Sequence, residues 1–334
     1  MLYPLKFHPV FMERVWGGRS LERLYGKGLP SGAVIGESWE IADRPEAVSV
    51  ISNGPLAGRD LRWLIENHPD ELLGAGHSPV ERFPLLIKIL DAEDTLSVQV
   101  HPPASAACRL GGEPKTELWY VAEARGPAEL WAGLRTGVNR GTFRRRLGDG
   151  SVAECLHRVR TRAGDAMFLP SGRVHAIGAG HVIFEIQQNS DTTYRVFDWN
   201  RAGLDGKPRA LHLPQALASI EFRDPSPRLV PRRFRQRDGV KTRWLTRNPW
   251  FTVRECEAQA GLERALESRG AFVILGLVSG RLAVRAPATG VTCELTAGEF
   301  ALIPSRSSGM VWEARTSAVF LEARPGGGVQ GRSR

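Results

Sequence analysis

The chain has 334 residues, 42% of them hydrophobic and 24% charged, so it can bury a large core and divide into about two domains. Its first residues lack the pattern of an export signal, and the longest apolar run, residues 271–278, is too short to span a bilayer. The net charge of +9 includes basic clusters at 143–146 and 231–243, but no helix-turn-helix, zinc-finger or stacking-aromatic pattern accompanies them. We therefore expect solvated surface and an interdomain linker there, and neither nucleic acid nor a membrane as a partner.

Strand-like runs dominate the chain, and a few short helical patterns interrupt them. Turn signals at short spacing favour a mostly β fold. A Pro- and Arg-rich stretch at about 225–245 predicts the domain boundary, and the tail from residue 325 onward should be disordered. The predicted elements are, in chain order, a strand at 48–54, a helix at 61–69, strands at 96–101 and 117–124, a helix at 139–148 opened by an asparagine cap, strands at 166–170 and 182–190, a helix at 213–220 opened by a proline, and strands at 271–286, 300–305 and 318–325.

The cysteines and lysines carry two further signals. Four cysteines lack CxxC spacing, so we interpret them as reduced thiols of a cytoplasmic protein. Only six of the 45 basic residues are lysines, yet Lys88 and Lys115 both lie close to the polar strand at 96–101. A compact ammonium differs from a guanidinium in pKa and reach, which suggests a function for these two lysines.

The stretch LSVQVHP, residues 96–102, reads as a short strand that a proline ends. Alternation with period two places its two valines on one face and Ser97, Gln99 and His101 on the other. The preceding run FPLLIKIL indicates an apolar neighbourhood. Buried polar groups that share one direction need partners, and a metal ion can supply them.

A second motif lies in the segment GDAMFLPSGRVHAIG, which holds Gly164, Pro170, Gly172 and His175 at the spacing G-x5-P-x-G-x2-H. This spacing predicts a tight turn, a strand, a second turn and then an inward-facing histidine at the mouth of a barrel. A jelly-roll barrel with two such strands facing each other can place several ligands around one ion.

Together the two motifs supply a candidate ligand set. Gln99, His101, Glu117 and His175 combine nitrogen and oxygen donors that suit zinc, with room left for water or substrate. A pair of histidines alone is more often structural. Polar residues clustered on strands that otherwise belong to the core favour the metal site.

These motifs resemble those of the cupin superfamily, in particular the type I phosphomannose isomerases (mannose-6-phosphate isomerases) of the short bacterial form. The cupin signature normally begins with H-x-H, whereas this chain has Gln-x-His, and an inserted loop delays Glu117. The resemblance spans residues 1 to about 215. It rests on blocks in the family's order: VWGG, GESWEIADRP, PLLIKILDAEDTLSVQVHP, EPKTELWY, PSGRVHAIG and EIQQNSDTTYRVFDWNR.

The resemblance implies a fold and an activity. The fold would be a double-stranded β-helix, the cupin or jelly-roll barrel, over residues 1–230 with few short helices. The activity would be a zinc-dependent aldose–ketose isomerase that interconverts mannose 6-phosphate and fructose 6-phosphate through a cis-enediol. One Zn²⁺ per chain would be held by Gln99, His101, Glu117 and His175.

The resemblance also implies roles in the sugar-phosphate pocket. Arg195 falls where the family carries its catalytic arginine, and Lys115 and Asp191 would be further catalytic residues, with the choice of general base left open between them. Ser97 and Lys88 would bind substrate. Without the family motif, Arg195 could simply pair with a nearby aspartate, and Lys88 could be a lysine whose stem lies along apolar surface.

The C-terminal third repeats part of the pattern without its chemistry. Gly298 to Pro304 repeats the G-x5-P spacing, but no histidine follows. We therefore expect residues 231–334 to form a degenerate cupin-like barrel that binds no metal and ends in the disordered tail.

Two other classes of function remain alternatives. A cupin-like sugar-binding or regulatory module without turnover would be favoured by a missing Arg195 or Lys115, and both residues are present. An iron-dependent cupin oxygenase would use two histidines and a carboxylate with open positions, and Gln99 argues against it. The oligomeric state and the strictness for mannose stay open.

Overall fold

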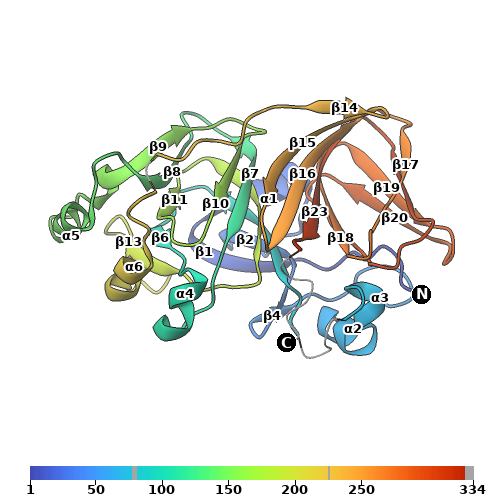
Figure 1. Ribbon diagram of the computed structural model, residues 1–334, viewed down its shortest axis with the longest axis horizontal. Coiled ribbons are helices and arrows are strands. Elements are labelled where there is room, and N and C mark those ends of the chain that lie inside the picture. Colours follow the sequence, from blue (N-terminus) through green and yellow to red (C-terminus); the bar gives the residue numbers. More distant parts are fainter. Residues whose placement is uncertain (77–80, 225, 328–334) are drawn as a thin grey trace.

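The computed structural model describes residues 1–76, 81–224 and 226–327. From residue 328 onward, the tail predicted to be disordered lies outside the described residues. The described chain is mostly β with few short helices, as predicted. Two pairs of sheets lie side by side, the first coloured blue to yellow-green and the second orange to red (Figure 1).

The first pair of sheets is built by the N-terminal part of the chain. Its strands pair antiparallel with their neighbours. The six-stranded sheet has the order β1-β2-β5-β12-β7-β10, with bounds Val10–Gly18, Ile35–Ile41, Leu85–Ala92, His181–Gln188, Glu117–Ala124 and Ala166–Leu169. The five-stranded sheet has the order β13-β6-β11-β8-β9, with bounds Tyr194–Phe197, Val98–Val100, His175–Ile177, Glu129–Leu134 and Leu156–Arg160. A small ribbon pairs β3 and β4, Asp43–Arg44 and Ala47–Val48.

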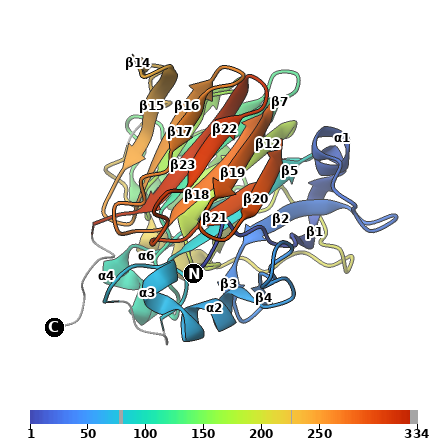
Figure 2. The same ribbon diagram turned by 90° about the vertical axis from the view of Figure 1, so that its right-hand side faces the viewer.

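The second pair of sheets faces the viewer in Figure 2. Its six-stranded sheet has the order β14-β15-β16-β23-β18-β21, with bounds Arg235–Arg237, Val240–Arg247, Phe251–Ala258, Ala318–Pro325, Val273–Ser279 and Phe300–Ile303. Its four-stranded sheet has the order β17-β22-β19-β20, with bounds Glu263–Ala265, Val311–Ala314, Arg281–Ala286 and Val291–Thr296. The stretch at 225–245 that was predicted as a linker therefore contains β14 and most of β15.

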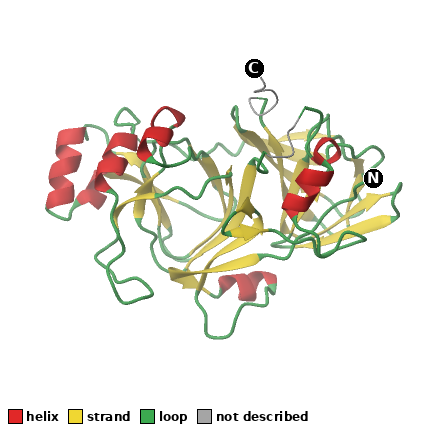
Figure 3. Ribbon diagram, turned by 90° about the horizontal axis from the view of Figure 1, so that it is seen from below, coloured by secondary structure: helices red, strands yellow, loops and turns green. Residues whose placement is uncertain are grey.

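The helices are short and lie at the periphery of the strands (Figure 3). The predicted asparagine cap is present, because the Asn139 side chain accepts a hydrogen bond from the N–H of Thr142 at 3.0 Å. The helix predicted at 61–69 is two helices that meet at Pro69. The α-helices α1 to α6 have bounds Ser20–Tyr25, Leu61–Asn67, Pro69–Leu72, Ala104–Ala107, Arg140–Gly148 and Leu213–Ser219, and two 3-10 helices span Cys108–Leu110 and Val152–Cys155. No helix in the described ranges is long and apolar enough to cross a membrane.

One hydrophobic core joins the two pairs of sheets. Phe83 of the first pair and Phe272 of the second pack with ring centroids 4.7 Å apart. Leu5 and Leu302 exchange backbone hydrogen bonds of 2.9 and 2.8 Å, so the first residues of the chain lie against the C-terminal third. The largest cluster of buried side chains accordingly draws on both ends of the sequence.

The short strand β6 positions the candidate site. Val98 and Val100 are buried in a separate core cluster, whereas Ser97 and Gln99 line a cavity on the other face. This is the alternation that the sequence predicted. Gln99 is paired with His175 of β11 on one side and with Arg195 of β13 on the other, so three motifs that are distant in the sequence meet at one strand.

Candidate metal centre and active-site pocket

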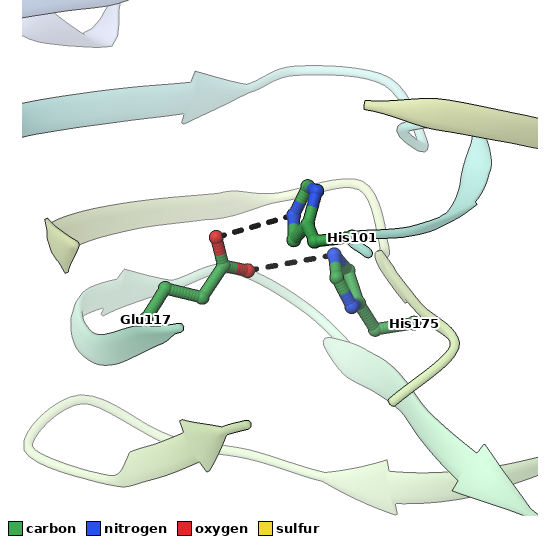
Figure 4. Close-up of side chains that lie close together, drawn as sticks. All are labelled: His101, Glu117 and His175. Carbon is green, nitrogen blue, oxygen red and sulfur yellow. Dashed lines mark ion pairs between the residues drawn. The ribbon is translucent and has the colours of Figure 1, made fainter. Parts of the chain in front are cut away.

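Three side chains that could hold a metal ion meet between the two sheets of the first pair. His101 follows β6, Glu117 begins β7 and His175 begins β11. Their side chains point toward one another (Figure 4). Nε2 of His101 lies 3.3 Å from one carboxylate oxygen of Glu117, and Nε2 of His175 lies 3.4 Å from the other. One ligand atom from each residue falls within 4.8 Å of the others, which is a spacing that one ion can bridge.

Backbone carbonyls orient the two imidazoles. Nδ1 of His101 donates to the carbonyl of Thr192 at 2.8 Å, and Nδ1 of His175 donates to the carbonyl of Arg173 at 2.9 Å. Both Nε2 atoms are thereby left free to bind a metal, as in known metal sites. The amide of Gln99 lies against the same group, with its Nε2 3.3 Å from Nε2 of His175. Rotation of this amide by half a turn would place its oxygen there instead.

The buried polar atoms of this cluster fit a bound cation. His101, Glu117 and His175 are at most 2% exposed, and no hydrogen bond from the described residues reaches Nε2 of His101 or the carboxylate oxygens of Glu117. Burial lowers the pKa of His175 to about 3, so its imidazole is neutral as a ligand must be. Burial alone would raise the pKa of Glu117, but Lys115 and the histidines hold it well below its usual range.

A cavity of about 250 Å³ opens beside the metal cluster. It brings together Gln99 and the five residues of the predicted sugar-phosphate pocket, and it also contains charged residues that the sequence analysis did not single out. The lining residues that matter for the chemistry are Arg14, Glu37, Lys88, Ser97, Gln99, Lys115, Glu185, Asp191, Arg195 and Arg209. A deep, highly charged cavity of this kind suits a small anionic substrate.

Lys115 lies between two buried carboxylates. Its Nζ is 3.1 Å from Glu117 and 3.4 Å from Glu185. Burial by itself would lower the pKa of Lys115, but these two carboxylates outweigh it and raise the pKa, which keeps the ammonium charged. The pKa of Glu185 is also raised, because burial brings it to about 7 despite the nearby ammonium.

Lys88 and Asp191 form a second charged group on the cavity wall. Nζ of Lys88 donates to Asp191 at 3.0 Å and lies 3.3 Å from Glu37. It also lies over the Trp39 ring, 4.6 Å from the centroid. Burial would raise the pKa of Asp191, but the ammonium of Lys88 holds it below its usual value. The ammonium of Lys88 is therefore paired with two carboxylates on the cavity wall.

Arg195 lies on the cavity wall without a carboxylate partner in the described part of the chain. Asp191 pairs with Lys88, and Asp198 pairs with Arg209 and Arg201. The alternative in which Arg195 pairs with either aspartate is therefore not seen. Its Nη1 donates to the carbonyl of Ala210 at 2.8 Å, while its buried Nε has no hydrogen-bond partner among the described residues.

Glu185 is the main pocket residue that sequence reasoning missed. It lies in β12, where the run VIFEIQQ places Glu185 and Gln187 at alternate positions of an otherwise apolar strand. The same signal singled out Gln99 in β6 and His101 directly after it. Arg14 and Glu37, which hydrogen-bond each other, come from β1 and β2, where the sequence predicted no strand.

Residues 4–116 match the family model of the type I phosphomannose isomerase catalytic domain. A mannose-6-phosphate isomerase of Streptococcus mutans is 36% identical to this chain over 282 residues, which cover 84% of this chain and 86% of the relative. This match decides the family. The chain belongs to the type I phosphomannose isomerase family.

Solved structures of the family match the fold over almost the whole chain. The crystal structure of the mannose 6-phosphate isomerase from Bacillus subtilis covers 96% of this chain, and this chain covers 99% of it, with a TM-score of 0.86 and 29% identity. A mannose 6-phosphate isomerase bound with zinc and yttrium covers 97% of this chain and is covered completely, with a TM-score of 0.73 at 19% identity. As a phosphomannose isomerase family member, the chain is an enzyme of the isomerase class.

Proposed function

We propose that this chain interconverts mannose 6-phosphate and fructose 6-phosphate through a cis-enediol, with one zinc ion per chain. The observation that carries the proposal is the buried cluster of His101, Glu117 and His175, which opens on a charged cavity in a member of this isomerase family. A sugar phosphate, with its dianionic group, matches the cations of that cavity.

Zinc would be held by His101, Glu117 and His175 together with Gln99. Its chemistry, when bound, is to polarise or orient the oxygens of the substrate as a Lewis acid. The two neutral imidazoles and the ionised Glu117 supply the donors that the ion prefers. Their burial excludes bulk water from the same space.

Proton transfer requires a group that takes the proton from C2 of the aldose and returns it to C1 of the ketose, while the hydroxyl proton moves from O2 to O1. We assign this transfer to Glu185. Its pKa of about 7 suits both halves of the transfer near neutral pH, and it lines the cavity. Lys115 stays charged between Glu117 and Glu185, which makes it a stabiliser of developing negative charge and a poor base. Asp191 stays ionised beside Lys88 and is the weaker base.

Arg195 would stabilise the enediolate oxygens, because a guanidinium without a carboxylate partner can offer its donors to substrate. Ser97 and Lys88 would bind the sugar phosphate, Ser97 through its hydroxyl on the cavity wall and Lys88 through its charge.

For the fold, we propose two double-stranded β-helix barrels of the cupin type, one formed by each pair of sheets. Residues 1–230 would form the catalytic barrel and residues 231–334 the degenerate one. The four cysteines are free thiols in the structure, which supports a cytoplasmic location.

Isotope exchange tests the enediol. Turnover of mannose 6-phosphate in deuterated water should place deuterium at C1 of fructose 6-phosphate, and the reverse reaction should place it at C2 of mannose 6-phosphate. Complete retention of the label from C2-deuterated mannose 6-phosphate, together with no solvent incorporation after prolonged turnover, would indicate a hydride shift and contradict the proposal.

A further inference from the structure

The backbone of Arg195 is held by a histidine 17 residues further along the chain. The N–H of Arg195 donates to Nδ1 of His212 at 3.2 Å, and the N–H of His212 donates to the carbonyl of Arg195 at 2.8 Å. The imidazole thus completes a pair of hydrogen bonds that a neighbouring strand would otherwise supply. β13 is an edge strand of its sheet, so this edge has no strand partner to hold it.

The same loop also holds the Arg195 side chain. The carbonyl of Ala210, two residues before His212, accepts a hydrogen bond from Nη1 of Arg195 at 2.8 Å. His212 therefore fixes the loop and the backbone of Arg195 relative to each other, and the loop in turn directs the guanidinium. The His212 side chain makes no capping hydrogen bond to α6, although it precedes the helix directly.

Only one form of His212 can act in this way. Because Nδ1 accepts the N–H of Arg195, it must carry no proton, and the ring proton must be on Nε2. Burial and the positive charge of Arg195 both lower the pKa of His212, which favours this neutral form.

We propose that His212 is a positioning residue for the isomerase reaction, acting through its Nδ1 acceptor to hold Arg195 in its place on the cavity wall. The inference rests on the proposed role of Arg195. His212 itself does not line the cavity, so its effect must pass through the arginine.

Two substitutions of His212 distinguish the loss of its hydrogen-bond acceptor from the loss of its aromatic ring. His212→Phe keeps an aromatic ring beside Tyr194, whose ring centroid lies 6.1 Å away, but it removes the acceptor. His212→Asn removes the ring and keeps an acceptor at the same distance from the backbone as Nδ1. We expect kcat to fall about tenfold in the Phe variant, the scale of one lost hydrogen bond, and to stay within about twofold of wild type in the Asn variant. Leu211→Ala, an exposed neighbour, is the control for disturbing the loop.

A double-mutant cycle shows whether the effect passes through Arg195. His212→Phe should lower kcat in the wild-type background and have no further effect in an Arg195→Ala background, with zinc content and melting temperature unchanged. Additive losses, a larger loss in the Asn variant than in the Phe variant, or wild-type rates in both would overturn the inference. A loss confined to proteins with a lowered melting temperature would also overturn it, because it would mark a structural role.

The cycle also keeps this inference distinct from the proposed function. Normal kcat in His212→Phe alongside a large loss in Arg195→Ala contradicts only the role of His212. Normal kcat in Arg195→Ala contradicts the role of Arg195 and the inference that depends on it.

Discussion

Arg195 lies on the cavity wall, and no carboxylate among the described residues pairs with its positive charge. Each neighbouring aspartate is already engaged by another cation, and the carbonyl of Ala210 fixes one edge of the guanidinium. Burial and the charge of Arg209 lower the pKa of Arg195, but a guanidinium remains protonated at any physiological pH. A fixed cation of this kind is suited to negative charge that develops during the reaction.

Arg195→Ala should lower kcat by about 10²–10³, the usual cost of losing one preorganised donor. Zinc content and melting temperature should stay near wild type, because among the described residues the side chain hydrogen-bonds to the carbonyl of Ala210 and to no carboxylate or member of the metal cluster. Arg195→Lys should restore little, since a point charge does not reproduce the planar fork of donors. Steady-state kinetics checks this, and an increase in KM with unchanged kcat would mean that Arg195 only binds substrate.

Glu185 should make the catalytic rate depend on pH near neutrality. Its pKa is raised to about 7, so the carboxylate form that accepts a proton is lost as the pH falls through that value. We expect kcat/KM to decline on the acid side of about pH 7 and Glu185→Gln to lose about 10²–10⁴ in kcat.

The exposed carboxylate Glu93, replaced in the same way, is the control for Glu185. A Glu185→Gln enzyme with normal turnover would return the role of general base to Asp191 or Lys115.

The sequence allowed single site residues to be predicted wherever a polar residue interrupted an apolar strand. Gln99 and His101 were found in that way, and Glu185 carries the same signal in β12. By contrast, Arg243 of β15 forms a buried ion pair with Glu255 on the neighbouring strand β16, although the basic run at 231–243 was predicted to be surface and linker. The hydroxyl of Tyr120, from the first pair of sheets, donates to Glu255 at 3.0 Å, and a local sequence pattern does not contain such a long-range contact.

The turn before β11 is the element on which the metal cluster depends. Gly172 has a φ of +88°, and its N–H donates to the carbonyl of His101 at 2.8 Å. A Cβ at this position would lie 3.1 Å from the carbonyl oxygen of Ser219. The glycine of the G-x5-P-x-G-x2-H motif therefore links the segments of His101 and His175, two of the proposed zinc ligands, at a position where side chains rarely fit.

Gly172→Ala should destabilise the protein by about 1–2 kcal/mol and weaken zinc binding, because the strained turn displaces His175 or His101. Gly150→Ala is the matched control. Gly150 also has a positive φ of +80°, but it has open space around it and lies far from the ligands in sequence. Both variants should lose stability in denaturant titrations, and only the first should lose zinc in competition with a chelator. Equal zinc affinity in the two would show that the turn does not position the ligands.

Elements with strong local signals were predicted closely, and those without them were missed. β7 and β23 coincide with the predicted runs, and α5 begins at its predicted cap. β1 and β2 were not predicted, because glycines and charges interrupt their apolar pattern. Their strand structure depends on pairing with each other and with β5.

The two pairs of sheets share one hydrophobic core. The contacts of Phe83 with Phe272 and of Leu5 with Leu302 connect the ends of the sequence. The sequence predicted two similar units from the repeated G-x5-P spacing. It could not predict that they share one core, because the contacts join residues separated by most of the chain.

A fragment of residues 1–230 should not fold by itself. Removal of the C-terminal third exposes the buried face around Phe83, Leu5 and Ile51, which packs against residues of the second pair of sheets. We expect the fragment to aggregate or to bind a hydrophobic dye, whereas the full chain unfolds in one cooperative calorimetric transition. A monomeric fragment that binds zinc and turns over substrate would contradict the shared core as a requirement for folding.

Zinc-dependent isomerase activity is tested most directly by a coupled assay that follows fructose 6-phosphate formed from mannose 6-phosphate, with metal analysis of the same sample. We expect turnover with one zinc per chain, loss of turnover after exhaustive chelation and recovery on adding zinc. His175→Ala should lack both metal and activity. Full activity in the chelated, metal-free enzyme, or no turnover of mannose 6-phosphate by the zinc-loaded enzyme, would contradict zinc-dependent isomerase activity.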